Sequence, residues 1–312
     1  MKIKHILYPV DFSDCSRALN RQVEWVANHF DAEVTLLHVF EIPVMWYGTG
    51  EPPMINAECF QQFASNAEEQ LSGYPIELPA SRVNRAIEEG DVAWHINNWV
   101  EEHDVDLVMM GTHGYGSMRR LLLGSVAMKV LHDVSCPVWT SSPHEESLPK
   151  KPMAPSRILC ALELTEEAVP LLRFVNKLAQ DLRASVHLIH TVPGTDSRPY
   201  RYFDMDLRNY LKECTANDIA KSQHEAGTDF PVTITEGSIS QITAAVAADQ
   251  QADLVVIGRG KAQAVLGTLR THAYEIIRHA PCSVLSYCSA RAKIKTSDSE
   301  SQSQSETALA VS

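Results

Sequence analysis

The chain has 312 residues, of which 45% are hydrophobic and 21% are charged, and its net charge at pH 7 is −12. This length predicts two domains, each long enough to bury a core of its own. The negative charge disfavours nucleic acid as the main partner, because binding a polyanion requires clustered Lys and Arg. It allows a small anion such as a nucleotide, because backbone N–H groups can hold phosphate without a basic surface.

The sequence favours a soluble, cytoplasmic protein without a membrane segment. Its seven cysteines are scattered and form no Cys-x-x-Cys pair, which is typical of a reducing compartment. The first residues contain no long apolar run before a small-residue cleavage site, and no apolar stretch reaches the ~18 residues of a membrane helix. The histidines and cysteines lack zinc-site spacing, so we expect no metal site of the protein's own.

The first half alternates short apolar runs with helical patterns. The runs expected to be strands are 3–10, 34–40, 105–110 and 136–140. After the first run, the polar cluster 11–14 is typical of a helix N-cap, and Asp91 is expected to begin a later helix. This alternation predicts a doubly wound α/β fold with a parallel sheet, whose ligands bind at the carboxyl ends of the strands.

A glycine-rich segment follows the run 105–110. It contains Gly111, His113 and Gly114, and the pair Gly124-Ser125 then begins the next helical pattern. Glycines let a backbone approach an anion closely, and the free amides at a helix start favour negative charge. The segment is neither a Walker loop nor a dinucleotide fingerprint, because no Gly-Lys-Ser/Thr follows and the glycines come after a late strand.

The second half repeats the first after about 145–150 residues, a period that indicates a duplicated domain. The run 158–162 matches the first strand, and 253–258 matches the strand before the glycine segment. We therefore predict a domain at 1–141, a linker at 142–156, a domain at 157–290 and a disordered polar tail at 291–312.

Several motifs in this order resemble the ATP-binding branch of the universal stress protein family. They are the opening run 4–13, the segment Leu36-Leu37-His38-Val39, the closing run 135–138, and Gly-x-x-Gly followed after nine residues by Gly-Ser. The resemblance implies two tandem doubly wound domains, each with a five-stranded parallel sheet flanked by helices. Members of the family usually dimerise through the last strand, and tandem members pack their domains as an internal pseudo-dimer. A homodimer of the chain is a further possibility.

The resemblance also implies a nucleotide site in the first domain, with Asp11 and Val39 at the nucleoside end. The residues expected around ATP are Pro9, Asp11, Val39, Met110, Gly111, Gly114, Gly124, Ser125 and Val126. Arg119 and Arg120 either reach phosphate oxygens or are simply solvated. Mg²⁺ would arrive with ATP, coordinated mostly by phosphate and water.

The second domain departs from this pattern. It reads Gly258-Arg259-Gly260-Lys261 with a shorter segment before the next helix, and Glu163 stands at the position of Asp11. Either the duplicated site has decayed while the fold is kept, or Arg259 and Lys261 bind a different anion.

These features favour an ATP-binding regulatory or protective protein, with at most slow hydrolysis, because no residue orients His113 as a catalytic base. The alternatives are an interaction scaffold without a nucleotide and, less favoured, an adenylating or phosphoryl-transfer enzyme. His38 and His190 are expected to be packed structural residues. The aromatic loops 41–56 and 193–204 either cover the nucleotide sites, contact the other domain or simply pack down, and their aromatic residues favour domain contact. The sequence does not identify a protein partner.

Overall fold

The computed structural model describes residues 1–41, 57–112, 123–141, 154–192, 204–259 and 269–289. Its two halves contain the same series of strands and α-helices, and the first half adds a 3₁₀ turn. In the first half these are β1 (His5–Pro9), α1 (Asp14–Phe30), β2 (Glu33–Phe40), α2 (Ala57–Ser72), the 3₁₀ turn η1 (Ala80–Arg82), β3 (Val83–Glu89), α3 (Val92–Glu102), β4 (Leu107–Met110), α4 (Ser125–Asp133) and β5 (Val138–Thr140). In the second half they are β6 (Arg157–Ala161), α5 (Ala168–Leu182), β7 (Ser185–Val192), α6 (Asp204–Ala226), β8 (Val232–Glu236), α7 (Ile239–Asp249), β9 (Leu254–Gly258), α8 (Leu269–His279) and β10 (Ser283–Tyr287).

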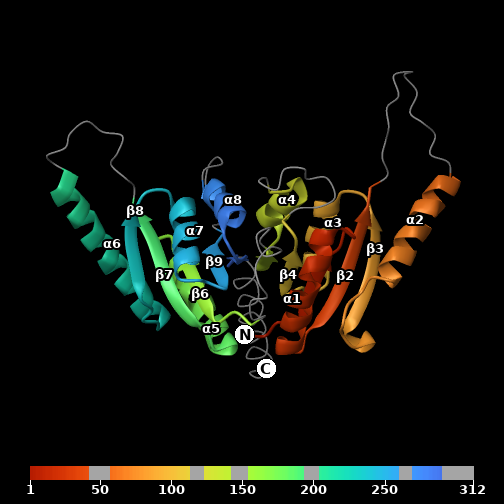
Figure 1. The fold of residues 1–312 in the computed structure, drawn as a ribbon, viewed down its shortest axis with the longest axis horizontal. Coiled ribbons are helices and arrows are strands. Elements are labelled where there is room, and N and C mark those ends of the chain that lie inside the picture. Colours follow the sequence, from red (N-terminus) through yellow and green to blue (C-terminus); the bar gives the residue numbers. More distant parts are fainter. Residues whose placement is uncertain (42–56, 113–122, 142–153, 193–203, 260–268, 290–312) are drawn as a thin grey trace, which may run out of the picture.

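The described strands form one sheet that runs through both halves (Figure 1). The strand order is β3-β2-β1-β4-β5-β10-β9-β6-β7-β8. Neighbouring strands within each half are parallel, whereas β5 and β10 pair antiparallel with Trp139 opposite Leu285. The predicted α/β fold with two five-stranded parallel sheets is therefore confirmed. The two halves join edge to edge along the β5–β10 pair, which we call the seam.

Each face of the sheet is covered by one layer of helices. One core cluster contains residues of α1 and α5, such as Leu19 and Leu172, and the other contains residues of α3, α4 and α8, such as Ile96, Val130 and Ile277. Both clusters include residues from both halves. The cores are therefore continuous across the seam, as expected where apolar faces of a sheet are buried together.

The four predicted strands of the first half correspond to β1, β2, β4 and β5 within two residues at each end. Ser13 is the N-cap of α1, and its side chain accepts a hydrogen bond from the Ser16 amide; Asp91 caps α3 in the same way through the Trp94 amide. The apolar pattern missed β3, because this edge strand is only partly buried and carries charged residues such as Arg85.

Some predictions concern residues outside the described part of the chain. The tail 291–312 lies there entirely, and so do most of the linker 142–156 and of the loops 41–56 and 193–204. None of the described helices is long and apolar enough to cross a membrane.

Candidate functional site

The candidate site lies where β1 and β4 end and α4 begins. The Gly124 amide donates a hydrogen bond of 2.9 Å to the Thr112 carbonyl, which brings the start of α4 to the end of β4. Thr112 is buried, and its hydroxyl donates to the Ser141 carbonyl at 3.3 Å. Both ends of the glycine-rich segment are therefore fixed to the carboxyl edge of the sheet, as the doubly wound fold predicts for a ligand site.

The first turn of α4 presents free backbone donors at this edge. Its N-cap is Gly124, which has no side chain to accept hydrogen bonds from the first amides, and the carbonyl of Gly124 already accepts the Met128 amide. Among the described residues, the amides of Ser125 and Val126 have no hydrogen-bond partner. Unpaired amides at the positive end of a helix form a favourable site for an anion such as phosphate.

The carboxylate of Asp11 is held in one orientation directly after β1. Its Oδ1 accepts hydrogen bonds from the Ser13 amide at 3.0 Å, the Ser13 hydroxyl at 2.6 Å and the Ser16 hydroxyl at 2.6 Å. The residue between, Phe12, is buried and has a left-handed backbone conformation with φ of 63°. Among the described residues, the donors to this carboxylate all bind Oδ1, so Oδ2 is left as an acceptor that could meet the hydroxyl groups of a ribose.

His38, near the end of β2, packs behind Asp11. Its Nδ1 lies 2.8 Å from the Val10 carbonyl, and its ring lies against that of Phe12 with centroids 4.3 Å apart. Burial lowers the pKa of His38, which favours the neutral ring that donates from Nδ1. His190 makes the equivalent contact with the Leu162 carbonyl at 2.8 Å. Both histidines thus support the backbone at the end of the first strand of their half.

The structure places part of the predicted ATP-binding set around this edge. Pro9 and Gly111 are half-buried at the ends of β1 and β4, while Val39 and Met110 are buried. Gly114, Arg119 and Arg120 lie outside the described residues, as does His113, so their predicted roles stay predictions. The hydroxyl groups of Ser13 and Ser16 were not part of the predicted set, although their three-residue spacing after a strand is a signal of capping.

The second half lacks the same arrangement. Glu163 replaces Asp11, and within the described residues its carboxylate has no counterpart of the serine hydroxyl contacts. The partly exposed Glu163 carboxyl has a raised pKa because the surrounding protein desolvates it, and the nearby His272 and His190 oppose that shift. Glu163 therefore differs as an acceptor from Asp11, whose carboxylate is held by the serine hydrogen bonds.

Arg259, which with Lys261 was one of two alternatives for the second site, contacts the first half of the chain. Its guanidinium is buried at the seam and donates from one nitrogen to the Leu131 carbonyl at 2.7 Å and from the other to the Cys136 carbonyl. Burial lowers the pKa of Arg259. Leu131 is in the last turn of α4, so Arg259 caps a helix of the first half from the second half. Lys261 lies outside the described residues.

The described residues contain no group of three or more His, Cys, Asp or Glu side chains that could hold a metal ion. Six cysteines are free thiols, namely Cys15, Cys136, Cys160, Cys214, Cys282 and Cys288.

Comparisons with known proteins identify one family that matches both halves of the chain. The family model described as "Universal stress protein family" matches residues 2–141 and again residues 155–287. The chain is 30% identical over 140 residues to universal stress protein A homolog 1 of Coxiella burnetii, which covers 44% of this chain and 95% of that protein. It is 29% identical over 136 residues to a universal stress protein of Methanocaldococcus jannaschii, and this match covers 43% of this chain and 79% of that protein.

Solved structures show the same tandem architecture. A universal stress protein from Archaeoglobus fulgidus superposes with a TM-score of 0.62 at 19% identity, covering 92% of this chain and 97% of that one. A putative universal stress protein from Pseudomonas aeruginosa superposes with a TM-score of 0.58 at 16% identity. The superposition covers 92% of this chain and 93% of that one. At these identities the likeness extends to the fold alone.

Proposed function

Because the chain belongs to the universal stress protein family, we propose that it is a cytoplasmic regulatory or protective factor of the stress response that binds ATP in its first domain. The second domain would act mainly as a structural and regulatory partner. We propose no catalytic residue, so ATP would serve as a bound ligand and be hydrolysed slowly at most.

The observation that carries this proposal is the closure of the loop between β4 and α4. The bond from the Gly124 amide to the Thr112 carbonyl, 2.9 Å long, fixes the free amides of α4 at the same sheet edge as Asp11. Phosphate groups would bind the amides of Ser125 and Val126, and the Asp11 carboxylate would accept hydrogen bonds from the nucleoside. Together these groups supply donors for the anionic end of ATP and an acceptor for its polar sugar.

Binding of ATP would affect the contacts at the seam through α4. This helix has nine residues and spans about 13 Å. Its first amides would bind phosphate, while its last turn accepts the hydrogen bond from Arg259 and its Met128 carbonyl accepts one from the Tyr274 hydroxyl of α8 at 3.2 Å. A ligand that shifts α4 would therefore change contacts with the second domain, which is a physical route for regulation.

Equilibrium dialysis with radiolabelled ATP tests the proposal. Wild-type protein should bind ATP, and Gly124→Trp should lose binding, because the added side chain occupies the approach to the first amides of α4. Met128→Trp is the matched control, since it places the same side chain on an exposed position of the same helix and should bind like wild type. Wild-type protein that is folded and binds no ATP would favour the scaffold function instead.

A further inference from the structure

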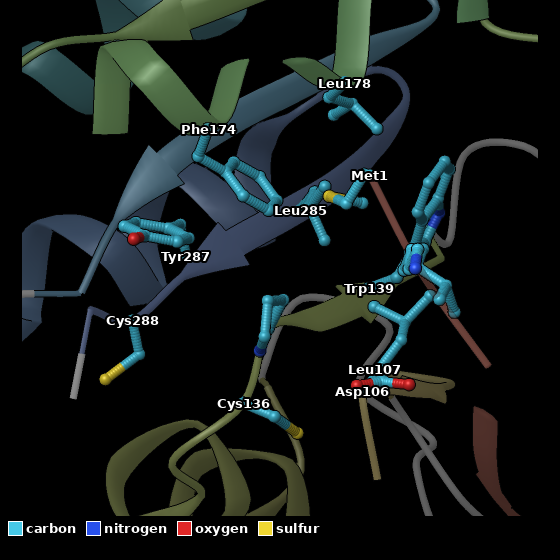
Figure 2. A pocket seen from close by; sticks show the side chains of 13 residues that line it. Met1, Asp106, Leu107, Cys136, Trp139, Phe174, Leu178, Leu285, Tyr287 and Cys288 are labelled. Atoms are coloured by element: carbon cyan, nitrogen blue, oxygen red, sulfur yellow. The ribbon is translucent and has the colours of Figure 1, made fainter. Parts of the chain in front are cut away.

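An apolar cavity of about 240 Å³ lies at the seam, away from the candidate nucleotide site. Figure 2 shows Phe174, Leu285 and Tyr287 of the second half on one side and Trp139 and Leu107 of the first half on the other. This volume is below the roughly 300–1,000 Å³ of pockets for drug-sized ligands. A molecule that fills it would be correspondingly smaller.

One position beside the cavity differs between the two sides of the pseudo-symmetric seam. When the left-handed C-cap residues Asp31 of α1 and Arg183 of α5 are matched, Phe174 stands at the position of Gln22. Gln22 reaches across the seam, and its Nε2 donates to the Ser283 hydroxyl at 3.1 Å. Phe174 instead stacks on Tyr287 within its own half, with ring centroids 4.4 Å apart. The cross-seam polar contact that α1 makes through Gln22 is therefore not made by Phe174.

One polar group in the cavity lining lacks a partner. Trp139 is 1% exposed, and its indole Nε1 is buried without a hydrogen-bond partner among the residues that the structure describes. Buried donors in folded proteins are rarely left unpaired, and an indole N–H is a donor only. Because Trp139 lines the cavity, an acceptor bound there could pair with this donor.

The charges around the cavity favour an uncharged ligand. Its lining contains the Asp106 carboxylate, the side-chain ammonium group of the exposed Lys2, and the terminal ammonium group of Met1, which is paired with Asp181 outside the lining. The Asp106 carboxylate already accepts the Lys4 and His5 amides, at 2.8 and 3.2 Å. Neither sign of charge predominates, so an ionic ligand gains no net attraction there.

We infer that the seam cavity binds a small, uncharged, mainly apolar molecule that accepts a hydrogen bond from the Trp139 indole through a carbonyl or ether oxygen. The apolar rings and Leu side chains supply the burial that drives binding, and the indole N–H selects for the acceptor. Because the ligand would contact both β5 and β10, it would stabilise the seam.

Two probes of similar shape test this inference on the whole protein without nucleotide. Acetophenone carries a carbonyl acceptor, and ethylbenzene lacks one. In ¹H–¹⁵N spectra, acetophenone should shift the indole resonance that is missing in Trp139→Phe. It should also bind about two- to tenfold more tightly than ethylbenzene, the range that one hydrogen bond supplies.

Variants separate the hydrogen bond from the cavity. Trp139→Phe should still bind both probes but without preference, and Leu178→Phe, which fills the cavity, should weaken both. Urea unfolding curves establish that each variant is folded. The inference is overturned if folded wild-type protein binds neither probe at millimolar concentration, if it binds both equally, or if a folded Leu178→Phe binds them undiminished.

Discussion

The Arg259 guanidinium donates a 2.7 Å hydrogen bond to the Leu131 carbonyl across the seam, joining residues 128 positions apart. Its second terminal nitrogen donates to the Cys136 carbonyl. Leu131 is near the end of the helix whose first amides form the candidate phosphate site. One buried side chain of the second domain therefore contacts the element of the first domain that we expect ATP to contact.

Removal of this side chain should destabilise the protein. Arg259→Ala leaves two buried carbonyls without donors, and we expect it to lower the free energy of unfolding by about 2–4 kcal/mol. Arg259→Lys should recover only part of the loss, because an ammonium group lacks the fork that reaches both carbonyls. Urea unfolding measures both, with the exposed Arg21→Ala as control. An Arg259→Ala curve that overlays the Arg21→Ala curve would contradict this role.

The serine hydroxyl groups that orient Asp11 should contribute to ATP affinity. Ser16→Ala removes one 2.6 Å hydrogen bond to the Asp11 carboxylate, and we expect ATP to bind about three- to tenfold more weakly. Asp11→Ala should have a larger effect, because it removes the acceptor itself. Titration of each variant with ATP provides the measurement, and an unchanged affinity in Asp11→Ala would remove this residue from the site.

Gly90 and Gly237 occupy matching positions after β3 and β8 and have φ values of +129° and +123°. Substitution by Ala at either should cost about 1–3 kcal/mol, because L side chains rarely adopt this conformation. An added Cβ would also lie 3.3 Å from His95 Nε2 at Gly90 and 3.2 Å from Ile242 Cδ1 at Gly237.

Gly73→Ala provides the control for these two substitutions. Its backbone has no positive φ, and a Cβ there would meet the Glu69 carbonyl at an ordinary 3.5 Å. Thermal or urea unfolding should therefore show a small change for Gly73→Ala and clear losses for the other two. Equal effects at all three positions would refute the conformational explanation.

His38 should make stability depend on pH. Burial lowers the pKa of His38 in the folded protein, so the unfolded chain binds the proton more readily. As the pH falls below the ordinary histidine value of about 6.5, the unfolded state gains this proton and stability decreases, until the folded-state pKa is also passed. The slope from one group is at most about 1.4 kcal/mol per pH unit.

The variant His38→Asn isolates this contribution, since its amide can still donate to the Val10 carbonyl. Unfolding free energies between pH 5 and 8 should fall less steeply on acidification for the variant than for wild type. If the unfolding free energy of the variant changed with pH as steeply as that of wild type, His38 would not have a lowered pKa in the folded protein.

Local patterns in the sequence were sufficient to predict most of the fold but not the hydrogen bonds that cross the seam. The buried strands and the caps at Ser13 and Asp91 follow from neighbouring residues, so they could be predicted. Arg259 was placed with Lys261 because it lies in a glycine-rich segment, yet its partners are in the other domain. No local pattern shows which side chain crosses an interface between distant parts of the chain.

The same reason explains what was missed in the site and at the sheet edge. The family resemblance implied that Asp11 lies beside the glycine-rich segment, and this agrees with the rule that strand ends meet at one edge of a parallel sheet. The Ser16 hydroxyl that orients it lies five residues away, beyond the left-handed turn at Phe12, and no local pattern shows that it faces Asp11. The edge strand β3 lacks a continuous apolar run, so only the family resemblance implied a fifth strand.

Calorimetric titration of the whole protein with ATP tests the central claim most directly, because it gives the number of sites per chain. We predict one site per chain, which disappears in Gly124→Trp while the protein stays folded. Two sites would show that the second domain binds nucleotide despite Glu163 and the buried Arg259. No binding by folded wild-type protein would contradict the proposal that the first domain is a nucleotide site.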